Sequence, residues 1–280
     1  ISDFSDLERI AKTVPEDARK LSDAFWPGPL TMIFKKTERV PMATTGGLPT
    51  VAVRMPSNKI AAALIRAAGG YIAAPSANRS GRPSPTVAKY VIEDLDGRIE
   101  MIIDGGFSAI GLESTIIDLS EGEPMILRPG YVTQEKMMQV IGNVDVDRTI
   151  LDASSKEAPK APGMKYRHYA PKGNLTIVEG PQEKVTACIN EKLSEGHKQG
   201  LKTGVIATDE TIEQYQADVK RSLGSRKNEE AIAHHLFEVL RQMDDEEVQL
   251  IFTESFAETG LGQATMNRLL KAAGHQVISL

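Results

Sequence analysis

The chain has 280 residues, a formal net charge of −5 and a hydrophobic fraction of 41%. At about 150 residues per domain, this length favours two ordinary domains. The balance of apolar and charged residues is typical of a globular protein, which excludes disorder and collagen-like repeats. The acidic excess argues against a protein that acts mainly by coating phosphate backbones, although a local basic pocket remains allowed.

Cysteine content and the length of the apolar stretches bear on location. The only cysteine is Cys188, which excludes a disulfide framework and a cysteine-based metal site and favours a reducing cytoplasm. Apolar runs such as residues 61–65 are far shorter than the roughly 20 residues that span a bilayer, so we expect no membrane segment.

In the first half of the chain, the pattern predicts more strands than helices. Helical periodicity and capping residues predict helices, and short apolar runs bounded by proline or glycine predict strands. The expected helices cover residues 15–25, 57–68, 86–93 and 133–141, and the expected strands cover residues 30–34, 51–54, 71–74, 101–104, 114–119 and 124–128.

In the second half, residues 142–173 lose any periodicity and are rich in Asp, Ser, Pro and Lys, which indicates an ordered linker. Strand then alternates with helix, which is typical of a small parallel-sheet α/β domain. The segments are 175–178, 184–193, 203–207, 209–214, 229–243, 248–253, 264–273 and 276–278. We therefore expect a first domain over 1–143, a linker over 144–173 and a second domain over 174–280.

The polar loop from Pro75 to Thr86 is the first candidate site. Ser76, Asn78 and Ser84 place hydroxyl and amide groups between a predicted buried strand and a helix, which is where α/β folds bind ligands. Donors beside a helix N-terminus favour anions, phosphates especially. The alternative is an ordinary turn, because these residue types also make turns.

Two arginines end apolar strands. Arg54 follows Thr50-Val51-Ala52-Val53, and Arg128 follows Met125-Ile126-Leu127. A guanidinium at a strand end can bind a carboxylate or phosphate through two parallel hydrogen bonds. The alternative is an arginine that extends its stem over the surface without a ligand.

Other motifs are open to two interpretations. The segment 104–115 is a glycine-rich connection that either approaches a ligand or forms a wide turn, and Gly260–Leu269 is either an anion site or helix packing. Residues 161–171 are too aromatic and cationic for a passive tether, so they lie over a pocket or pack between domains. The histidines lack metal-site spacing, and no nucleophile motif is present.

The strings Phe25–Thr31, Thr50–Pro56, Ala74–Asn78 with Pro85-Thr86, Gly111–Thr115, Ile126–Gly130, Pro162–Pro171 and Gly260–Leu270 occur together and in this order. This set resembles the YrdC-like family in its long two-domain form. The similarity covers essentially the whole chain. It implies an α/β fold: a twisted mixed sheet with surrounding helices, plus a smaller Rossmann-like parallel α/β C-terminal domain.

The resemblance implies the activity of the L-threonylcarbamoyladenylate synthases, a nucleotidyl transfer. The implied substrates are ATP with Mg²⁺, L-threonine and bicarbonate or CO2, and the implied products are threonylcarbamoyl-AMP and pyrophosphate. The product would serve the N6-threonylcarbamoyl modification of adenosine 37 in tRNA, with an indirect link to tRNA through a downstream transferase.

The resemblance also implies residue roles. For L-threonine, Arg54 would hold the carboxylate, and Ala74 and Ser114 would line the site. For ATP, the implied contacts are Thr50, Ser76, Asn78, Ser84 and Arg128, with Tyr166 or Tyr169 of the linker closing over the adenylate. The resemblance implies no catalytic nucleophile and no general base, and it assigns no side chain as a metal ligand.

One departure and two alternatives accompany this interpretation. The family begins with a segment that contains Thr-x-Tyr-Gly-Leu-Gly and a Lys-x-Arg followed by Asn. Ile1 aligns just past this segment, which the sequence lacks, so we expect the natural protein to be longer. A related hydrogenase maturation factor would carry zinc-finger modules, against which the single cysteine counts. From another class, the chain could be a non-catalytic RNA- or nucleotide-binding protein of this fold.

Overall fold

The computed structural model describes residues 1–147, 169–257 and 259–280. They form two compact units: one contains Ile1–Pro75 and Glu113–Pro162, and the other contains Ser76–Leu112 and Gly163–Leu280. The units interleave along the chain, because the segment 76–112 belongs to the unit that holds the C-terminal part. The linear boundaries at residues 143 and 173 stay a prediction, since most of the expected linker lies outside the described residues.

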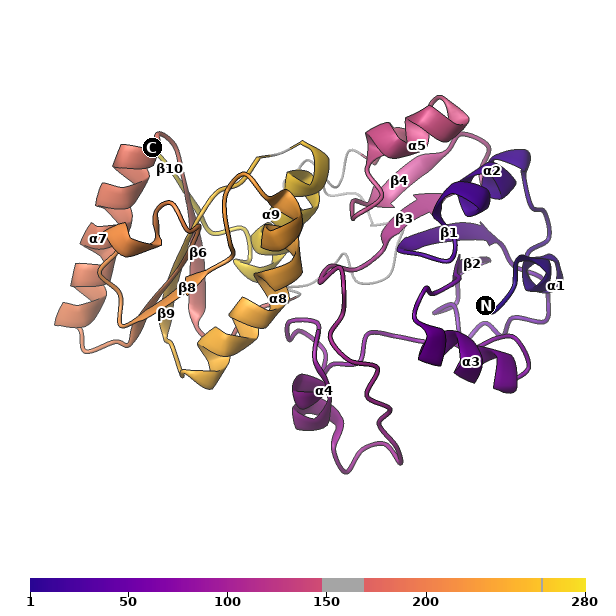
Figure 1. Cartoon of the computed structure of the whole chain (residues 1–280), viewed down its shortest axis with the longest axis horizontal. Coiled ribbons are helices and arrows are strands. Elements are labelled where there is room, and N and C mark those ends of the chain that lie inside the picture. The colour runs from indigo at the N-terminus through magenta and orange to yellow at the C-terminus, as the bar shows by residue number, and fades with distance from the viewer. Residues whose placement is uncertain (148–168, 258) are drawn as a thin grey trace. The chain divides into compact units, whose positions relative to one another are not determined.

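The first unit is a mixed five-stranded sheet with helices around it (Figure 1). The strand order is β2-β1-β3-β4-β5, in which β1 is antiparallel to β2 and parallel to β3, and β4 is antiparallel to β3. The elements are η1 (Phe4–Asp6), α1 (Leu7–Ile10), α2 (Glu16–Phe25), β1 (Leu30–Lys35), β2 (Thr50–Arg54), α3 (Lys59–Ala67), β3 (Thr115–Asp118), β4 (Met125–Arg128), α5 (Gln134–Ile141) and β5 (Asp145–Val146).

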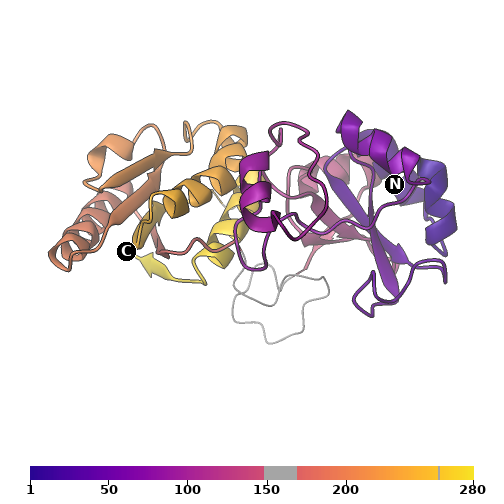
Figure 2. The same cartoon turned by 90° about the horizontal axis from the view of Figure 1, so that it is seen from below.

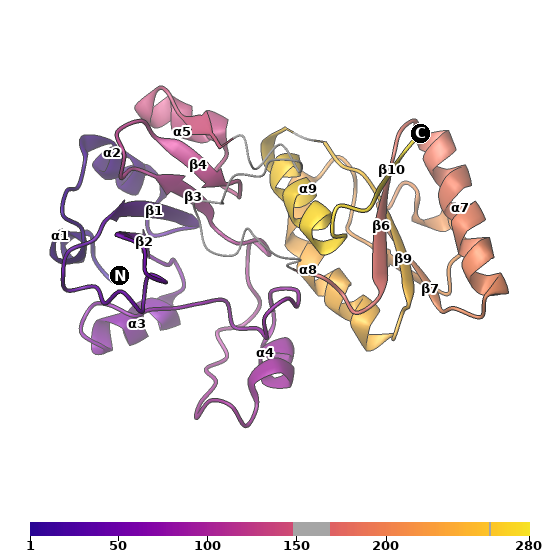
Figure 3. The same ribbon diagram turned by 180° about the vertical axis from the view of Figure 1, so that it is seen from behind.

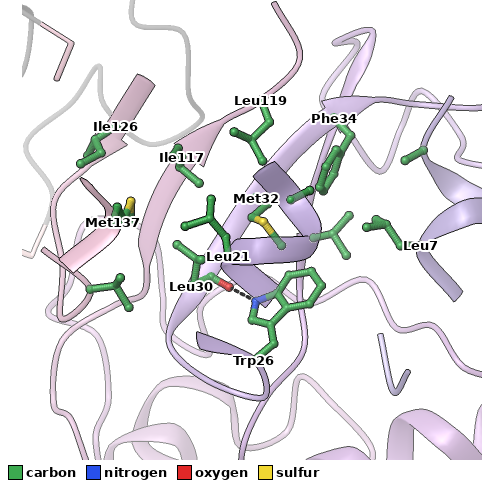
Figure 4. Close-up of a cluster of buried hydrophobic side chains, with 14 of the residues drawn as sticks. Leu7, Leu21, Trp26, Leu30, Met32, Phe34, Ile117, Leu119, Ile126 and Met137 are labelled. Carbon is green, nitrogen blue, oxygen red and sulfur yellow. Dashed lines mark hydrogen bonds between the residues drawn. The ribbon is translucent and has the colours of Figure 1, made fainter. Parts of the chain in front are cut away.

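The core of the first unit gathers around β1, whose first five residues are buried (Figure 4). Leu30, Met32 and Phe34 pack with Leu21 of α2 and Trp26. The indole Nε1 of Trp26 donates to the carbonyl oxygen of Leu30 at 2.7 Å. Helix α2 ends before Pro27, which cannot continue a helix, so the chain turns back and enters the sheet.

The second unit contains a five-stranded sheet in order β10-β6-β9-β7-β8, in which every described pair is parallel. This confirms the predicted parallel α/β domain. Its elements are α4 (Ala88–Leu95), β6 (Asn174–Glu179), α7 (Gln182–Lys198), β7 (Thr203–Ala207), η2 (Ile212–Gln214), β8 (Val219–Ser222), α8 (Glu229–Asp245), β9 (Leu250–Glu254), α9 (Gly260–Ala272) and β10 (Val277–Ser279).

Helices cover both faces of this parallel sheet. Figure 1 and, from behind, Figure 3 show α7 on one face and α8 with α9 on the other. Val185, Ile189 and Leu193 of α7 pack on Val178 and Val205 of the strands. Since a parallel sheet needs apolar cover on both faces, the strands are buried: all five residues of β7 are inaccessible to solvent or nearly so.

Two predicted strands are wrong. Residues 71–74 and 101–104 form neither strand nor helix. Ile72 and Met101 are exposed, Met101 by 74%. An extended segment becomes a strand only when a neighbour pairs with its backbone, and among the described residues none does so here. Strand β8 was missed instead, because Val-Lys-Arg-Ser lacks an apolar run.

Within the described ranges, no helix combines the length and apolarity needed to cross a bilayer.

The buried indole predicts a stability effect. In a Trp26→Phe variant, the ring stays apolar but becomes smaller, and the hydrogen bond to Leu30 is lost inside the core. The free energy of unfolding should therefore fall by about 1–3 kcal/mol. Urea denaturation followed by circular dichroism measures it. Met42→Ala, at a side chain 52% exposed, is the control and should change stability by less than about 0.5 kcal/mol; equal effects would contradict the assignment.

Candidate active site

Strand polarity brings Arg54 and Arg128 to the same edge of the mixed sheet. Both β2 and β4 run antiparallel to their neighbours β1 and β3, so their carboxyl ends lie beside the amino ends of those strands. In register, Arg54 pairs with Thr31 and Arg128 pairs with Ile116. The two arginines end strands that are three spacings apart, about 14 Å.

The turn before β1 holds Arg54. The Nε of Arg54 donates to the carbonyl oxygen of Gly28 at 2.9 Å, and the Gly28 N–H donates to the carbonyl oxygen of Met55 at 2.8 Å. Arg54 as a whole residue is exposed at the strand end. Neighbouring atoms nevertheless keep part of the water away from its guanidinium, and this desolvation lowers its pKa. The group nevertheless stays charged at neutral pH. Its Nη1 and Nη2 donate to no group in the described residues and can receive an anion.

A buried hydroxyl pair lies between the two arginines. Thr31 of β1 and Ser114, just before β3, share a hydrogen bond of 2.7 Å between their hydroxyl oxygens. Arg128 donates from Nη2 to the Ser114 hydroxyl at 3.2 Å and from Nε to the Ser114 carbonyl oxygen at 3.0 Å. The sheet edge therefore presents two cations with hydrogen-bonding hydroxyls between them, which suits a pair of anionic groups.

The loop of residues 76–86 belongs to the second unit. Asn78 donates from Nδ2 to the carbonyl oxygens of Arg79 and Arg82, at 2.9 and 3.4 Å. Its Oδ1 is buried and receives no hydrogen bond in the part of the chain that the structure describes. Ser76 is exposed and Ser84 is half-buried. The loop thus offers an amide oxygen and hydroxyls, as its composition predicted.

The carboxylate of Asp94 on α4 lies beneath this loop. It accepts the N–H of Arg79 at 3.2 Å and Nη1 of Arg82 at 2.6 Å. Burial alone would raise the pKa of Asp94, but hydrogen bonds from Arg241 and Arg79, together with the charges of Arg241 and Arg82, hold that pKa below its ordinary value. Asp94 is therefore a fixed negative charge under the loop.

Three of the other predicted site residues, Thr50, Ala74 and Tyr169, are among the described residues. Thr50 begins β2, four residues from Arg54 at the other end of the strand. Ala74 is exposed in the segment before the loop. Tyr169 is buried, with its ring 5.1 Å from that of Phe237. Tyr166 lies outside the described residues. The binding roles expected of these four residues, and of the other predicted site residues, stay predictions.

Sequence reasoning missed Thr31, Gly28 and Asp94. A polar residue within the otherwise apolar run Leu30–Phe34 is the signal that could have found Thr31, because such a residue is buried only with a partner. The need for glycine at position 28 is visible only in the structure: a Cβ there would lie 2.2 Å from the Phe25 carbonyl oxygen. Asp94 lies one residue past the end of the predicted helix 86–93 and belongs to no motif in the sequence.

Comparison with known proteins places this geometry in a family. Residues 1–130 match the family model described as telomere recombination, and residues 132–274 match that of the threonylcarbamoyl-AMP synthase C-terminal domain. The chain is 48% identical to the threonylcarbamoyl-AMP synthase of Pyrococcus abyssi, over all of this chain and 80% of that protein. The chain belongs to the threonylcarbamoyl-AMP synthase family.

Further relatives agree with this family. The threonylcarbamoyl-AMP synthase of Bacillus subtilis is 46% identical over 99% of this chain and 79% of its own length. The crystal structure of P. abyssi Sua5 complexed with L-threonine superposes with a TM-score of 0.92 at 48% identity, and covers all of this chain and 80% of that one. The family resemblance and the mixed α/β fold expected from the sequence are thus confirmed.

Because Gly28 has no room for a side chain, a Gly28→Ala variant should displace the turn that binds Arg54. We expect the free energy of unfolding to fall by about 2–4 kcal/mol, measured by urea denaturation. Gly46, which has a positive φ but no atom within 4 Å of an added Cβ, is the matched control; Gly46→Ala should cost about 1 kcal/mol. A Gly28→Ala variant as stable as the Gly46→Ala variant would contradict the close approach.

Proposed function

We propose that this chain makes threonylcarbamoyl-AMP and pyrophosphate from ATP, L-threonine and bicarbonate or CO2. The neutral amine of threonine adds to the carbon of CO2 and gives up a proton to solvent, which forms a carbamate; when bicarbonate is the source, it first loses water to give CO2. A carbamate oxygen attacks the α-phosphorus of ATP, a new phosphorus–oxygen bond forms, and the bond to the bridging oxygen breaks as pyrophosphate leaves. Positioning and charge neutralisation suffice for this step, so no nucleophile from the protein is needed.

The observation that carries the proposal is the cationic edge of the mixed sheet. Arg54 keeps Nη1 and Nη2 for a carboxylate while its Nε is held by Gly28, which is the geometry of a bidentate carboxylate contact. Arg128 and Ser114 form a second polar group on the same edge. We assign Arg54 and Ser114, with Ala74, to L-threonine and Arg128 to the nucleotide.

For ATP, we further propose contacts from Thr50, Ser76, Asn78 and Ser84, and closure over the adenylate by Tyr166 or Tyr169. The phosphate-contact role fits the hydroxyl and amide groups of residues 76–86.

Mg²⁺ would shield the triphosphate charge when bound with ATP. The described residues contain no cluster of three carboxylate, histidine or cysteine side chains that could hold a metal. Magnesium in ATP sites is commonly held by substrate phosphates with one or two protein oxygens. The buried Oδ1 of Asn78, which receives no hydrogen bond from the described residues, fits such a ligand.

We place the product in the formation of N6-threonylcarbamoyladenosine at position 37 of tRNA, through a downstream transferase, and the reaction in the cytoplasm, in keeping with the single cysteine. A non-catalytic RNA-binding role is not favoured, because the chain belongs to a family of enzymes and has a net charge of −5.

The Arg54 assignment predicts a specific loss of activity. With the complete natural chain, pyrophosphate release should require both L-threonine and bicarbonate. Arg54→Ala should lower kcat/KM for threonine at least about a hundredfold, since a bidentate charged contact is removed. Arg66→Ala, at an exposed arginine of α3, is the control and should keep wild-type turnover. Threonine-independent release, or equal activity of the two variants, would refute the proposal.

The metal assignment makes a second prediction. Removing divalent ions with EDTA should abolish pyrophosphate release, and added Mg²⁺ should restore it. Asn78→Ala should need a higher Mg²⁺ concentration for half-maximal activity than the wild type, because one oxygen ligand is lost. If the variant needs the same Mg²⁺ concentration as the wild type, Asn78 is not a metal ligand. The proposed synthase activity would not be affected by that result.

A further inference from the structure

A fully buried arginine of α8 contacts the loop of residues 76–86. The guanidinium of Arg241 donates to the carbonyl oxygen of Pro83 from Nε at 2.9 Å and from Nη2 at 2.6 Å. It also donates to both carboxylate oxygens of Asp94, from Nη1 at 3.2 Å and from Nη2 at 2.6 Å. Both side chains are inaccessible to solvent. Figure 2 shows α4 beside the helices of the C-terminal part.

The next turn of α8 adds a second contact with the same loop. Asp244, whose side chain is 2% exposed, accepts Nη2 of Arg82 at 3.2 Å. It also accepts the backbone N–H of Lys172 at 2.6 Å, and the N–H of Ala170 donates to the carbonyl oxygen of Gly81 at 3.0 Å. The loop is therefore fixed at Gly81, Arg82 and Pro83 by α8 and by the segment that leads into β6.

These fixed points lie between Asn78 and Ser84. The loop has little regular structure of its own: it contains two prolines, Pro83 and Pro85, and Gly81 has a φ of +88°. The Arg82 carbonyl oxygen that accepts from Asn78 belongs to the residue that Asp94 and Asp244 hold. A displacement at Pro83 would thus be transmitted to Asn78 on one side and to Ser84 on the other.

The chemistry of this cluster argues for a positioning role. A buried ion pair is weak evidence for stability, because an apolar pair of similar volume often serves equally well. Directional bonds to one backbone carbonyl, however, fix the path of the chain in a way that apolar packing does not. Two of the four bonds of Arg241 end on Pro83, which is a loop residue rather than a charge partner.

We propose that Arg241, with Asp94 and Asp244, is a positioning residue that holds the loop of residues 76–86 in its nucleotide-binding conformation. This inference rests on the proposed function, in which Ser76, Asn78 and Ser84 contact the triphosphate. It gives α8 of the C-terminal part a role in ATP binding that acts through the loop.

The test compares Arg241→Met with Arg226→Met in the complete natural chain. Arg226 is the matched control, because it also pairs with a buried carboxylate, Glu254, and contacts none of the residues 76–86 in the described hydrogen bonds. We expect Arg241→Met to raise KM for ATP about tenfold or more while KM for L-threonine changes less than about twofold. The control should leave both constants within about twofold of the wild type.

Other outcomes would overturn the inference. An ATP KM of Arg241→Met within twofold of the wild type would exclude positioning. Parallel increases in both KM values, or an equal change in Arg226→Met, would indicate general destabilisation. If Arg241→Met does not fold, Arg241→Lys and the isosteric Asp244→Asn are judged by the same criteria.

Two additional measurements separate this inference from the proposed function. Calorimetric titration of ATP without threonine tests loop positioning even if threonine-dependent turnover is absent, so the two ideas can fail separately. In a double-mutant cycle, Arg241→Met combined with Asn78→Ala should weaken ATP binding less than the sum of the single effects, because both act through one loop. Full additivity would contradict action through Asn78.

Discussion

The two antiparallel pairings in the mixed sheet, β2 with β1 and β4 with β3, are the constraint on which the candidate site depends. Because β2 and β4 run opposite to β1 and β3, the carboxyl ends of two apolar strands meet the amino ends of two others. Arg54, Thr31, Ser114 and Arg128 therefore come to one edge. Reversing either pairing would send one arginine to the far edge, about 15 Å away along the strand, and the cationic edge would be lost.

The second unit follows a different principle, in which buried charges hold irregular backbone. The loop of residues 76–86 is not part of a sheet, so no strand pairing fixes its backbone. Hydrogen bonds to the side chains of Asp94, Arg241 and Asp244 set its path instead. This makes the C-terminal part of the chain a structural support for a loop that comes early in the sequence. The interleaving of the two units is the consequence.

Local signals were sufficient for most elements. Proline and glycine punctuation around Leu30–Lys35, and the buried β-branched run of Thr203–Ala207, defined those strands closely. The strand-end positions of Arg54 and Arg128 were likewise predictable. The segments 71–74 and 101–104 were not, since a strand depends on its partner. Neither was Arg241 with Asp94, because a contact between residues 147 positions apart leaves no local trace.

Arg54 and Arg128 lie on one sheet edge, and we assign them to different substrates. Calorimetric titration of L-threonine and of ATP, separately, into Arg54→Ala and Arg128→Ala variants of the complete natural chain tests this assignment. We expect Arg54→Ala to lose threonine affinity and keep ATP affinity, and Arg128→Ala to do the reverse. Equal loss of one ligand in both variants, or no loss in either, would contradict it.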